Sequence, residues 1–347
     1  MVELAENRIK GNKKNKEKSI YKIALLILSC FVLVFLLAVS ISIGAANIHL
    51  STVWNAVFQF DSTVQAHQII QEIRLPRSIG ACLIGACLAV SGAILQGLTR
   101  NPLADSSIMG VTSGAALALI IVLVFFPALS MAEQSLASFV GAGLGVLIVF
   151  GIGTFSKGSV SPAKLALAGV AVSSLFQAIT TAIALHFDMA KNMGFWYAGG
   201  LNKVNWSGVH VLFIVCIVGI AAAILISKAL TILSLGEDVS KGLGQNTLII
   251  RAIGFAVTLF LTGAAVSVAG PIGFVGLVVP HITRFLIGPD YRWIIPFSAV
   301  FGAILLVLSD AVARMVNAPF ETPAGVIMAI IGVPFFLYLA RGERRRA

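Results

Sequence analysis

Charged residues are scarce in this sequence. Asp, Glu, Lys and Arg make up 11% of its 347 residues, whereas soluble domains contain about 25%. Apolar residues reach 58%, and the mean hydropathy is +0.99. This composition excludes a soluble enzyme, a disordered chain and a small disulfide-stapled secreted module. The chain is therefore predicted to be an integral membrane protein.

The motifs of several enzyme classes are also missing. There is no G-x-x-x-x-G-K-[ST] loop, so the chain is not expected to hydrolyse ATP itself. There is no G-x-S-x-G and no H-E-x-x-H, and the only adjacent acidic residues are Glu237 and Asp238. The five histidines are scattered, and no pair of the four cysteines has C-x-x-C spacing. We expect a non-catalytic chain without a metal or cofactor of its own, so any ATP energy would come from a partner.

Charges are nearly absent from the middle of the apolar stretches. The exceptions, Arg77, Asp310 and Arg314, fall near the ends that are predicted to face outward. Intramembrane charges mark the ion relays of many transporters, because each is costly in lipid. Their scarcity disfavours an ion-coupled secondary transporter, which remains the alternative function. A structural membrane scaffold is a third possibility.

Charge-poor apolar runs are abundant. A membrane-spanning helix needs about 20 residues, and ten runs are candidates: 23–44, 78–97, 107–126, 134–155, 165–187, 207–227, 248–269, 273–287, 293–312 and 323–340. The two runs between Ala252 and Thr283 share 32 residues and turn at Gly270 and Pro271. One of these two is therefore expected to be short or broken.

The basic residues orient the chain. With ten crossings and an inner amino terminus, 19 of the 24 Lys and Arg residues lie on the inner side, as the positive-inside rule requires. Both termini are therefore predicted to be cytoplasmic. Residues 1–22 form a basic, poorly ordered tail, 23–342 a single membrane domain, and 343–347 a basic end. The net charge of +10 lies beside the membrane spans and does not indicate nucleic-acid binding.

The sequence contains a weak internal repeat. Residues 83–102 and 261–280 match at seven of twenty positions at a constant offset of 178. If the match is real, the two helices lie five crossings apart and run in opposite directions, as in inverted-repeat transporters.

Two polar clusters stand out from the apolar background. Arg74, Arg77 and Arg314 lie at outward helix ends, where they could pair with carboxylates of a docking protein. The alternative is that they reach the membrane interface as ordinary interfacial side chains. The second cluster lies in the inner loop, about 228–250, where Gly236 can end one helix and Gly244 another. This loop predicts either a short amphipathic helix that contacts a soluble partner or an ordinary connection.

Three blocks of sequence resemble the signatures of one family. They run from Arg74-Leu75-Pro76-Arg77 to Asn101-Pro102-Leu103-Ala104-Asp105, from Gly270-Pro271 to Pro280-His281-Ile282-Thr283-Arg284, and from Asp310 through Arg314 to Phe336. They occur in order over roughly residues 50–342. In these blocks the chain resembles the FecCD family, the permease subunits of ABC importers for iron-siderophores, haem and cobalamin.

The resemblance implies an all-α bundle like that of cobalamin-importer permeases. Two permease subunits, identical or paralogous, would share one extracytoplasmic substrate-binding protein, and each would hold one ABC ATPase subunit carrying ATP and magnesium. It assigns docking of the binding protein to Arg74, Arg77 and Arg314. It assigns coupling to the ATPase to Leu235, Gly236, Glu237, Asp238, Leu243 and Gly244, and its motif positions include Asn101, Pro102, Gly270, Pro280, His281 and Arg284. The expected cargo is a ferric siderophore or related metal chelate.

Overall fold

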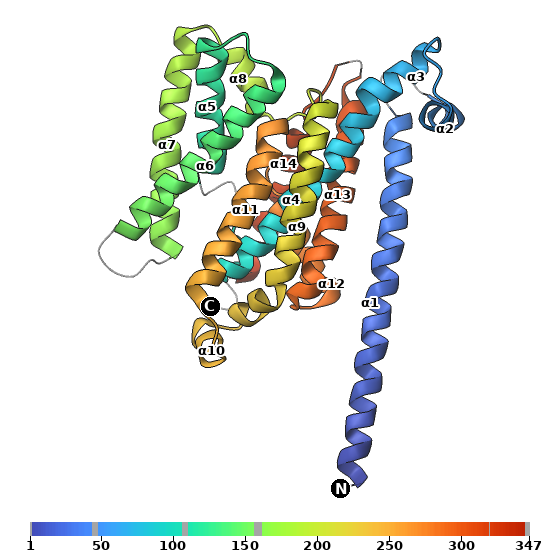
Figure 1. Ribbon diagram of the computed structural model, residues 1–347, viewed down its shortest axis with the longest axis vertical. Helices are drawn as coiled ribbons and strands as arrows, with labels where there is room; N and C mark the ends of the chain where they lie inside the picture. Colours follow the sequence, from blue (N-terminus) through green and yellow to red (C-terminus); the bar gives the residue numbers. More distant parts are fainter. Residues whose placement is uncertain (1, 44–47, 106–109, 156–161, 319, 344–347) are drawn as a thin grey trace.

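The computed structural model describes residues 2–43, 48–105, 110–155, 162–318 and 320–343, and every regular element in these ranges is a helix. Ten of these helices match the ten predicted crossings (Figure 1): α1 Val2–Ser42, α4 Leu75–Thr99, α5 Val111–Phe125, α6 Met131–Phe155, α7 Pro162–His186, α9 Trp206–Ser234, α11 Thr247–Ala269, α12 Val275–Ile287, α13 Tyr291–Val316 and α14 Ala324–Glu343. The short elements are α2 Leu50–Phe58, α3 Gln65–Ile69, the π-helix η1 Ile70–Arg74, α8 Ala190–Tyr197 and α10 Glu237–Gly242. The all-α, ten-helix prediction is confirmed.

The crossing helices differ in length. Within the described residues, seven helices are long and apolar enough to cross a membrane, and α5, α12 and α14 are shorter. With 13 residues, α12 rises about 20 Å, less than the hydrocarbon core of about 30 Å. The prediction of a short crossing between Ala252 and Thr283 is therefore confirmed, and the chain turns at Gly270, whose φ is +71°.

The basic amino-terminal segment differs from the sequence prediction. Residues 2–22 were expected to be poorly ordered, but the structure continues them as the first half of α1. The same helix holds the apolar run that begins at Ile23, and only 11% of its span is buried. At the inner end Lys22 lies over the ring of Trp293, 5.7 Å from its centroid. The carboxyl-terminal segment 344–347 lies outside the described residues.

Helix α4 is the central helix of the bundle. Its span is 83% buried, and it packs against α9, α11, α12 and α13. Glycines permit this close packing, because a Cβ on Gly85 would collide with the Gly302 carbonyl of α13 and one on Gly92 with Gly276 of α12. Such small-residue contacts are how membrane helices approach closely.

The helices form two groups in Figure 1. Helices α5, α6, α7 and α8 lie together on one side, and α4, α9 and α11–α14 form the larger group. α6 and α5 connect the groups through contacts with α11. α4 begins at the outer end and α11 begins at the inner end beside α10, so the two segments of the weak repeat run in opposite directions.

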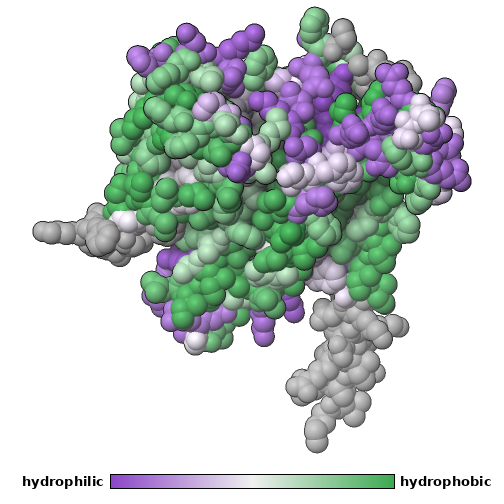
Figure 2. All heavy atoms as spheres, turned by 45° about the horizontal axis from the view of Figure 1, so that its top comes forward, coloured by the Kyte–Doolittle hydropathy of each residue, from purple (hydrophilic) through white to green (hydrophobic). Residues whose placement is uncertain are grey.

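The surface is consistent with a bilayer environment. Figure 2 shows apolar side chains in a broad middle band, with hydrophilic side chains toward the two ends. Large apolar side chains such as Phe31, Phe35 and Leu225 are 71%, 65% and 84% exposed. A soluble protein rarely exposes such a continuous apolar surface.

Candidate transport pathway and docking surfaces

The outer arginines are positioned by a local irregularity before α4. Pro76 lies in the first turn of α4 and has no N–H to donate. The preceding residues form the π-helix η1, in which the Leu75 N–H donates to the carbonyl of Ile70. Single-turn π-helices often occur at functional sites, and this one directs Arg74 and Arg77 into the space between α1 and α13.

Arg77 is enclosed by two carboxylates. Its Nη2 lies 3.0 Å from Oδ1 of Asp310, and its Nη1 lies 2.7 Å from Oε1 of Glu321. The side chain of Asp310 is fully buried, whereas that of Glu321 is 48% exposed. Arg314 completes the group, with its Nε 3.1 Å from Oδ2 of Asp310. We call Arg77, Asp310, Arg314 and Glu321 the outer ionic cluster.

The remaining arginine donors hold the end of α1. Arg74 donates to the carbonyls of Ile41 and Ser42 at 2.8 and 2.9 Å. Arg314 donates to the Ile43 carbonyl at 2.9 Å and to the Ser40 hydroxyl at 2.6 Å. These bonds satisfy carbonyls at a helix end, which have no partner within the helix.

The three predicted docking residues lie together and are buried. Arg74, Arg77 and Arg314 are 7%, 5% and 8% exposed, and their guanidinium groups bind carboxylates, carbonyls and a hydroxyl of this chain. Within this chain, α13 and the loop after it bring Asp310 and Glu321 to Arg77. Docking of a binding protein at these three arginines stays a prediction.

The inner loop forms the short helix that the sequence predicts. α10 follows Gly236, whose φ is +140°, and the chain leaves it through Leu243 and Gly244, whose φ is +77°. Both glycines occupy conformations that other residues rarely adopt. Ser240 is fully buried and hydrogen-bonds the Gln245 side chain in the following loop at 2.8 Å. α10 also contacts α9 and α11, so one face of it packs on the bundle.

The other face of α10 is apolar and exposed. Leu235, Val239 and Leu243 are 66%, 47% and 64% exposed. Val239 lies within α10, and Leu235 and Leu243 flank its two ends. We call these three residues the α10 stripe. An apolar stripe on the cytoplasmic side, outside the membrane-spanning helices, indicates a surface that binds another protein.

Glu237 faces the bundle. Its Oε2 lies 2.8 Å from Nη2 of Arg251 and 4.0 Å from Nη2 of Arg100, and its Oε1 lies 2.9 Å from Nζ of Lys241. The hydrogen bond from Lys241, followed by the charge of Arg251, lowers the pKa of Glu237 below its ordinary value. Glu237 thus connects α10 with the start of α11 and the end of α4, and we call these four residues the inner ionic cluster. Asp238 is exposed beside it.

The family-motif residues have structural partners. The Asn101 side chain accepts from the Leu103 N–H at 2.9 Å and stabilises the turn that contains Pro102. Arg284 of α12 hydrogen-bonds the Gln96 side chain of α4, which itself donates to the Gly276 carbonyl at 3.2 Å. Pro280 lies inside α12, and the ring of His281 packs edge-on against Phe335 of α14. A side chain on Gly270 would collide with the Trp196 carbonyl.

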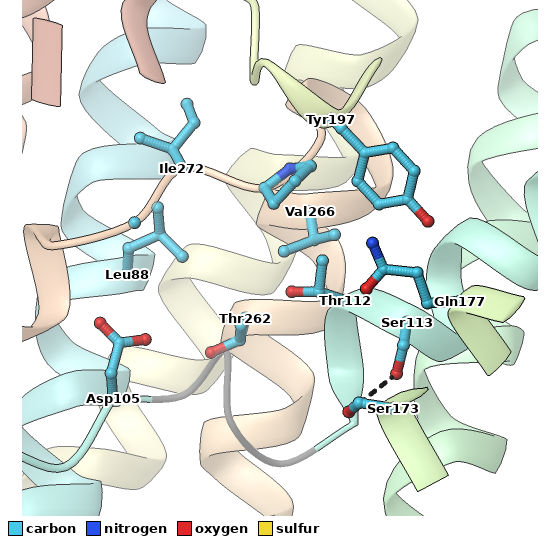
Figure 3. Close-up of a pocket in the computed structure, with 12 residues that line it drawn as sticks. Leu88, Asp105, Thr112, Ser113, Ser173, Gln177, Tyr197, Thr262, Val266 and Ile272 are labelled. Atoms are coloured by element: carbon cyan, nitrogen blue, oxygen red, sulfur yellow. Dashed lines mark hydrogen bonds between the residues drawn. The ribbon is translucent and has the colours of Figure 1, made fainter. Parts of the chain in front are cut away.

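A polar cavity of about 230 Å³ lies between the two helix groups (Figure 3). Leu88 and Gln177 line it and lie near the middle of α4 and α7, so the cavity is well inside the membrane region. Most of its described lining side chains are polar: Asp105, Thr112, Ser113, Ser173, Gln177, Tyr197 and Thr262. The Ser113 and Ser173 hydroxyls hydrogen-bond each other at 3.1 Å.

A second cavity of about 490 Å³ is larger and has a smaller share of polar lining. It lies toward the outer side, where Leu123, Phe139, Phe260 and Val268 line it, with Glu133 and Lys203 among its polar residues. Its lining is mostly apolar, as expected of a space open to lipid chains. The polar cavity is therefore the better candidate for contact with a hydrophilic cargo.

Sequence reasoning missed several of these residues. Asp310 was noted as a charge near an outward end but without its partners, Glu321 and Gln96 were visible only as parts of motifs, and Arg251 only as an inner basic residue. Thr262 gave no signal, because a threonine in an apolar helix is common. Asp310, Glu321, Gln96 and Arg251 acquire their roles from partners distant in the sequence or on another helix.

Comparison with known proteins identifies the family. The model of the FecCD transport family matches residues 32–342. The chain is 60% identical over 306 residues to the iron(3+)-hydroxamate import system permease protein FhuB of Bacillus subtilis (strain 168), covering 88% of this chain and 80% of that protein. It is 43% identical to the iron-uptake system permease protein FeuB of the same organism, covering 91% of this chain and 95% of that one.

A solved structure agrees with the fold. A structure described as an inward-facing metal-chelate type ABC transporter superposes with a TM-score of 0.80 and 29% identity, covering 92% of this chain and 99% of that chain. The chain belongs to the FecCD transport family. It is a multi-pass permease of the cytoplasmic membrane, and the resemblance seen in the three sequence blocks is confirmed.

Proposed function

We propose that this chain is the permease subunit of an ATP-driven importer that moves a ferric hydroxamate siderophore, or a closely related chelate, into the cytoplasm. The observation that carries the cargo assignment is the 60% identity to an iron(3+)-hydroxamate permease over 88% of the chain. The cargo passes without covalent change. Energy comes from an ABC ATPase that binds ATP and magnesium, since this sequence has no phosphate-binding loop.

The α10 stripe is the surface that we assign to the ATPase. Leu235, Val239 and Leu243 present apolar side chains on the cytoplasmic side, and burial of such side chains stabilises a protein contact by about 25 cal/mol per Å². Gly236 and Gly244 set the direction of the helix, and the inner ionic cluster attaches it to α4 and α11. Movement of the ATPase would therefore reach two crossing helices through Glu237.

The face of α7 is the surface that we assign to a second permease subunit and the pathway between the two. Ser174, Gln177 and Thr181 are exposed on one side of this helix, at intervals of three and four residues. Polar side chains at mid-membrane depth are unfavourable against lipid. A second subunit, identical or paralogous, together with an aqueous pathway, would remove that exposure.

The outer ionic cluster is the region that we assign to the binding protein. Docking through Arg74, Arg77 and Arg314 stays a prediction. Because these side chains are buried, docking requires a local rearrangement. A carboxylate of the binding protein reaches Nη1 of Arg77 only if Glu321 moves away, because Glu321 occupies that nitrogen at 2.7 Å. Glu321→Gln should then strengthen association with the binding protein. Glu133→Gln, which removes an outer carboxylate that accepts hydrogen bonds from Ser130, should not.

The first experiment is purification of the chain from its native membrane in mild detergent. Mass spectrometry of the bound proteins should find an ATPase and a second permease copy or paralogue. The purified assembly, reconstituted in vesicles with its loaded binding protein, should take up a ferric trihydroxamate when ATP is present. Uptake driven by an ion gradient without ATP would contradict the proposal, as would a chain that purifies alone.

A further inference from the structure

The polar cavity contains a hydroxyl group without a hydrogen-bond partner. Thr262 of α11 is 1% exposed and lines the cavity, and its Oγ1 makes no hydrogen bond in the described structure. Figure 3 places this side chain between Asp105 and Thr112, on the wall formed by α11. A buried hydroxyl without a partner costs about 1–3 kcal/mol, so a group that enters the cavity and bonds it is favoured.

The position of this hydroxyl is unusual for a helical threonine. Four others donate to the carbonyl four residues earlier in their own helices: Thr99, Thr180, Thr231 and Thr283. Such internal bonds are how threonine commonly satisfies itself within a helix. Thr262 does not make this bond, and protein atoms enclose its Oγ1. Because no hydrogen bond holds the hydroxyl, rotation about χ1 can turn it toward the cavity that Thr262 lines.

The opposite walls offer further hydrogen-bonding groups. Ser113 and Ser173 bond each other on the side of α5 and α7, and the Gln177 amide lies on the exposed face of α7. Helix α5 also begins beside the cavity at Val111. The cavity thus combines donors and acceptors from three helices, and it reaches the surface that we assign to the pathway.

The size of the cavity limits what it can hold. Pockets that enclose a drug-sized ligand measure about 300–1,000 Å³, and this cavity measures about 230 Å³. One subunit therefore accommodates one arm of a chelate, while the remainder stays beside α7.

We infer that this cavity is a contact site for the organic shell of the transported chelate, in which Thr262 hydrogen-bonds an amide or hydroxyl group of one arm. The inference rests on the proposed function, because it concerns the cargo of that importer. Thr262 is then a residue that determines specificity among chelates with the same metal centre. It favours those whose arms carry hydrogen-bonding groups.

The test compares two cargoes in one assay. Vesicles containing the complete importer receive a ferric trihydroxamate whose backbone carries free amide N–H groups, or its N-methylated analogue, each loaded on the same binding protein. The ratio of the two uptake rates is measured for each permease variant. The binding protein prefers one chelate to the same extent in every variant, so this preference cancels when the ratios are compared. A general folding defect lowers both uptake rates alike and leaves the ratio unchanged.

Thr262→Val removes the hydroxyl and keeps the shape of the side chain. It should reduce the uptake ratio roughly 2- to 10-fold, the range that corresponds to one hydrogen bond. Thr262→Ser, which keeps the hydroxyl, should preserve the ratio. Thr258→Val is the matched control, because Thr258 lies one turn earlier on α11, is 3% exposed and also lacks a partner, but does not line the cavity.

An unchanged ratio in Thr262→Val, or an equal change in Thr258→Val, would overturn the inference. If Thr262→Val does not assemble, Gln177→Leu replaces it as the test, because Gln177 lines the exposed wall of the same cavity. Gln177→Leu should also lower the uptake ratio, and an unchanged ratio in this variant counts against the inference. Failure of the proposed function has a different result, namely no ATP-dependent uptake of either chelate by the unmodified importer.

Discussion

The two ends of α4 carry ionic clusters of opposite character. In the outer ionic cluster the side chains of Arg77, Arg314 and Asp310 are 6%, 7% and 0% exposed. In the inner ionic cluster those of Glu237, Arg100 and Lys241 are 31%, 43% and 60% exposed. Exposed pairs contribute about 0–1 kcal/mol each, whereas disruption of a buried pair costs about 3–5 kcal/mol.

The difference separates a rigid end from a movable end. At the outer end, Arg77 and Arg314 cannot leave Asp310 without exposing buried charge, so α1, α4 and α13 are held together there. At the inner end the bonds between Glu237 and its partners can break and reform in water at low cost. A coupling helix that must move with an ATPase fits the second situation.

Removal of the buried counter-ion should have the largest effect. Asp310→Asn leaves Arg77 and Arg314 without their shared carboxylate and should lower the free energy of unfolding by about 3–5 kcal/mol. Thermal unfolding of the purified permease in detergent measures this. Asp238→Asn on exposed α10 is the control, with an expected change within about 0.5 kcal/mol. A loss below 1 kcal/mol in Asp310→Asn would contradict the rigid outer end.

The next effect concerns the helix that joins the two clusters. Gly92→Ala places a methyl group against the backbone of Gly276 and should cost about 1–3 kcal/mol. Gly143→Ala on α6 has open space around the new methyl group and should be neutral or stabilise the helix by up to about 1 kcal/mol. The same unfolding measurement compares them, and equal effects would show that close packing of α4 is unimportant.

Glu237→Gln should have a smaller effect on stability, less than about 1 kcal/mol. Its effect should instead be on coupling, with cargo transported per ATP hydrolysed falling about two- to fivefold. Assembly with the ATPase should persist, because the α10 stripe is unchanged. The charge exchange Glu237→Arg with Arg251→Glu restores the bond between α10 and α11 and should recover coupling. If coupling is unaffected in Glu237→Gln, the contact of Glu237 with α11 does not transmit the movement of the ATPase.

The smallest effect is a dependence on pH. The pKa of Glu237 is lowered in the folded protein, so its stabilising bonds are complete above the ordinary glutamate pKa and disappear as the pH falls through the lowered value. Amide hydrogen exchange of α10, corrected for its intrinsic pH dependence, should therefore accelerate only in strongly acidic solution. Glu237→Gln should show no such step, and a step near neutral pH would contradict the assignment.

Hydropathy was sufficient to predict the ten helices, because lipid selects long apolar segments. Their direction follows from the positive-inside rule and stays a prediction. The turn glycines Gly236 and Gly244 also predicted α10. Side-chain partners were not predictable in the same way. Arg77 and Asp310 are 233 residues apart, and no local pattern shows that the guanidinium group will be buried.

The same limit applies to the cavity. Thr258 and Thr262 have similar sequence surroundings, and only the packing of α11 against α5 and α6 decides which one lines the polar space. Pro76 and the π-helix before it also illustrate the limit. The sequence places a proline at a helix start but does not show that the preceding turn widens.

The attachment of α1 has a consequence for how the protein is made. Arg314 donates to Ile43 and Ser40, which precede it by 271 and 274 residues. During synthesis, α1 emerges from the ribosome first. Arg314, which donates to groups at the end of α1, emerges only after most of the chain. The span of α1 is 11% buried, so this helix can remain stable in lipid during that interval without the rest of the bundle. A chain that ends before α13 would leave the first helix inserted and held only by Arg74 and its contacts with α2 and α4.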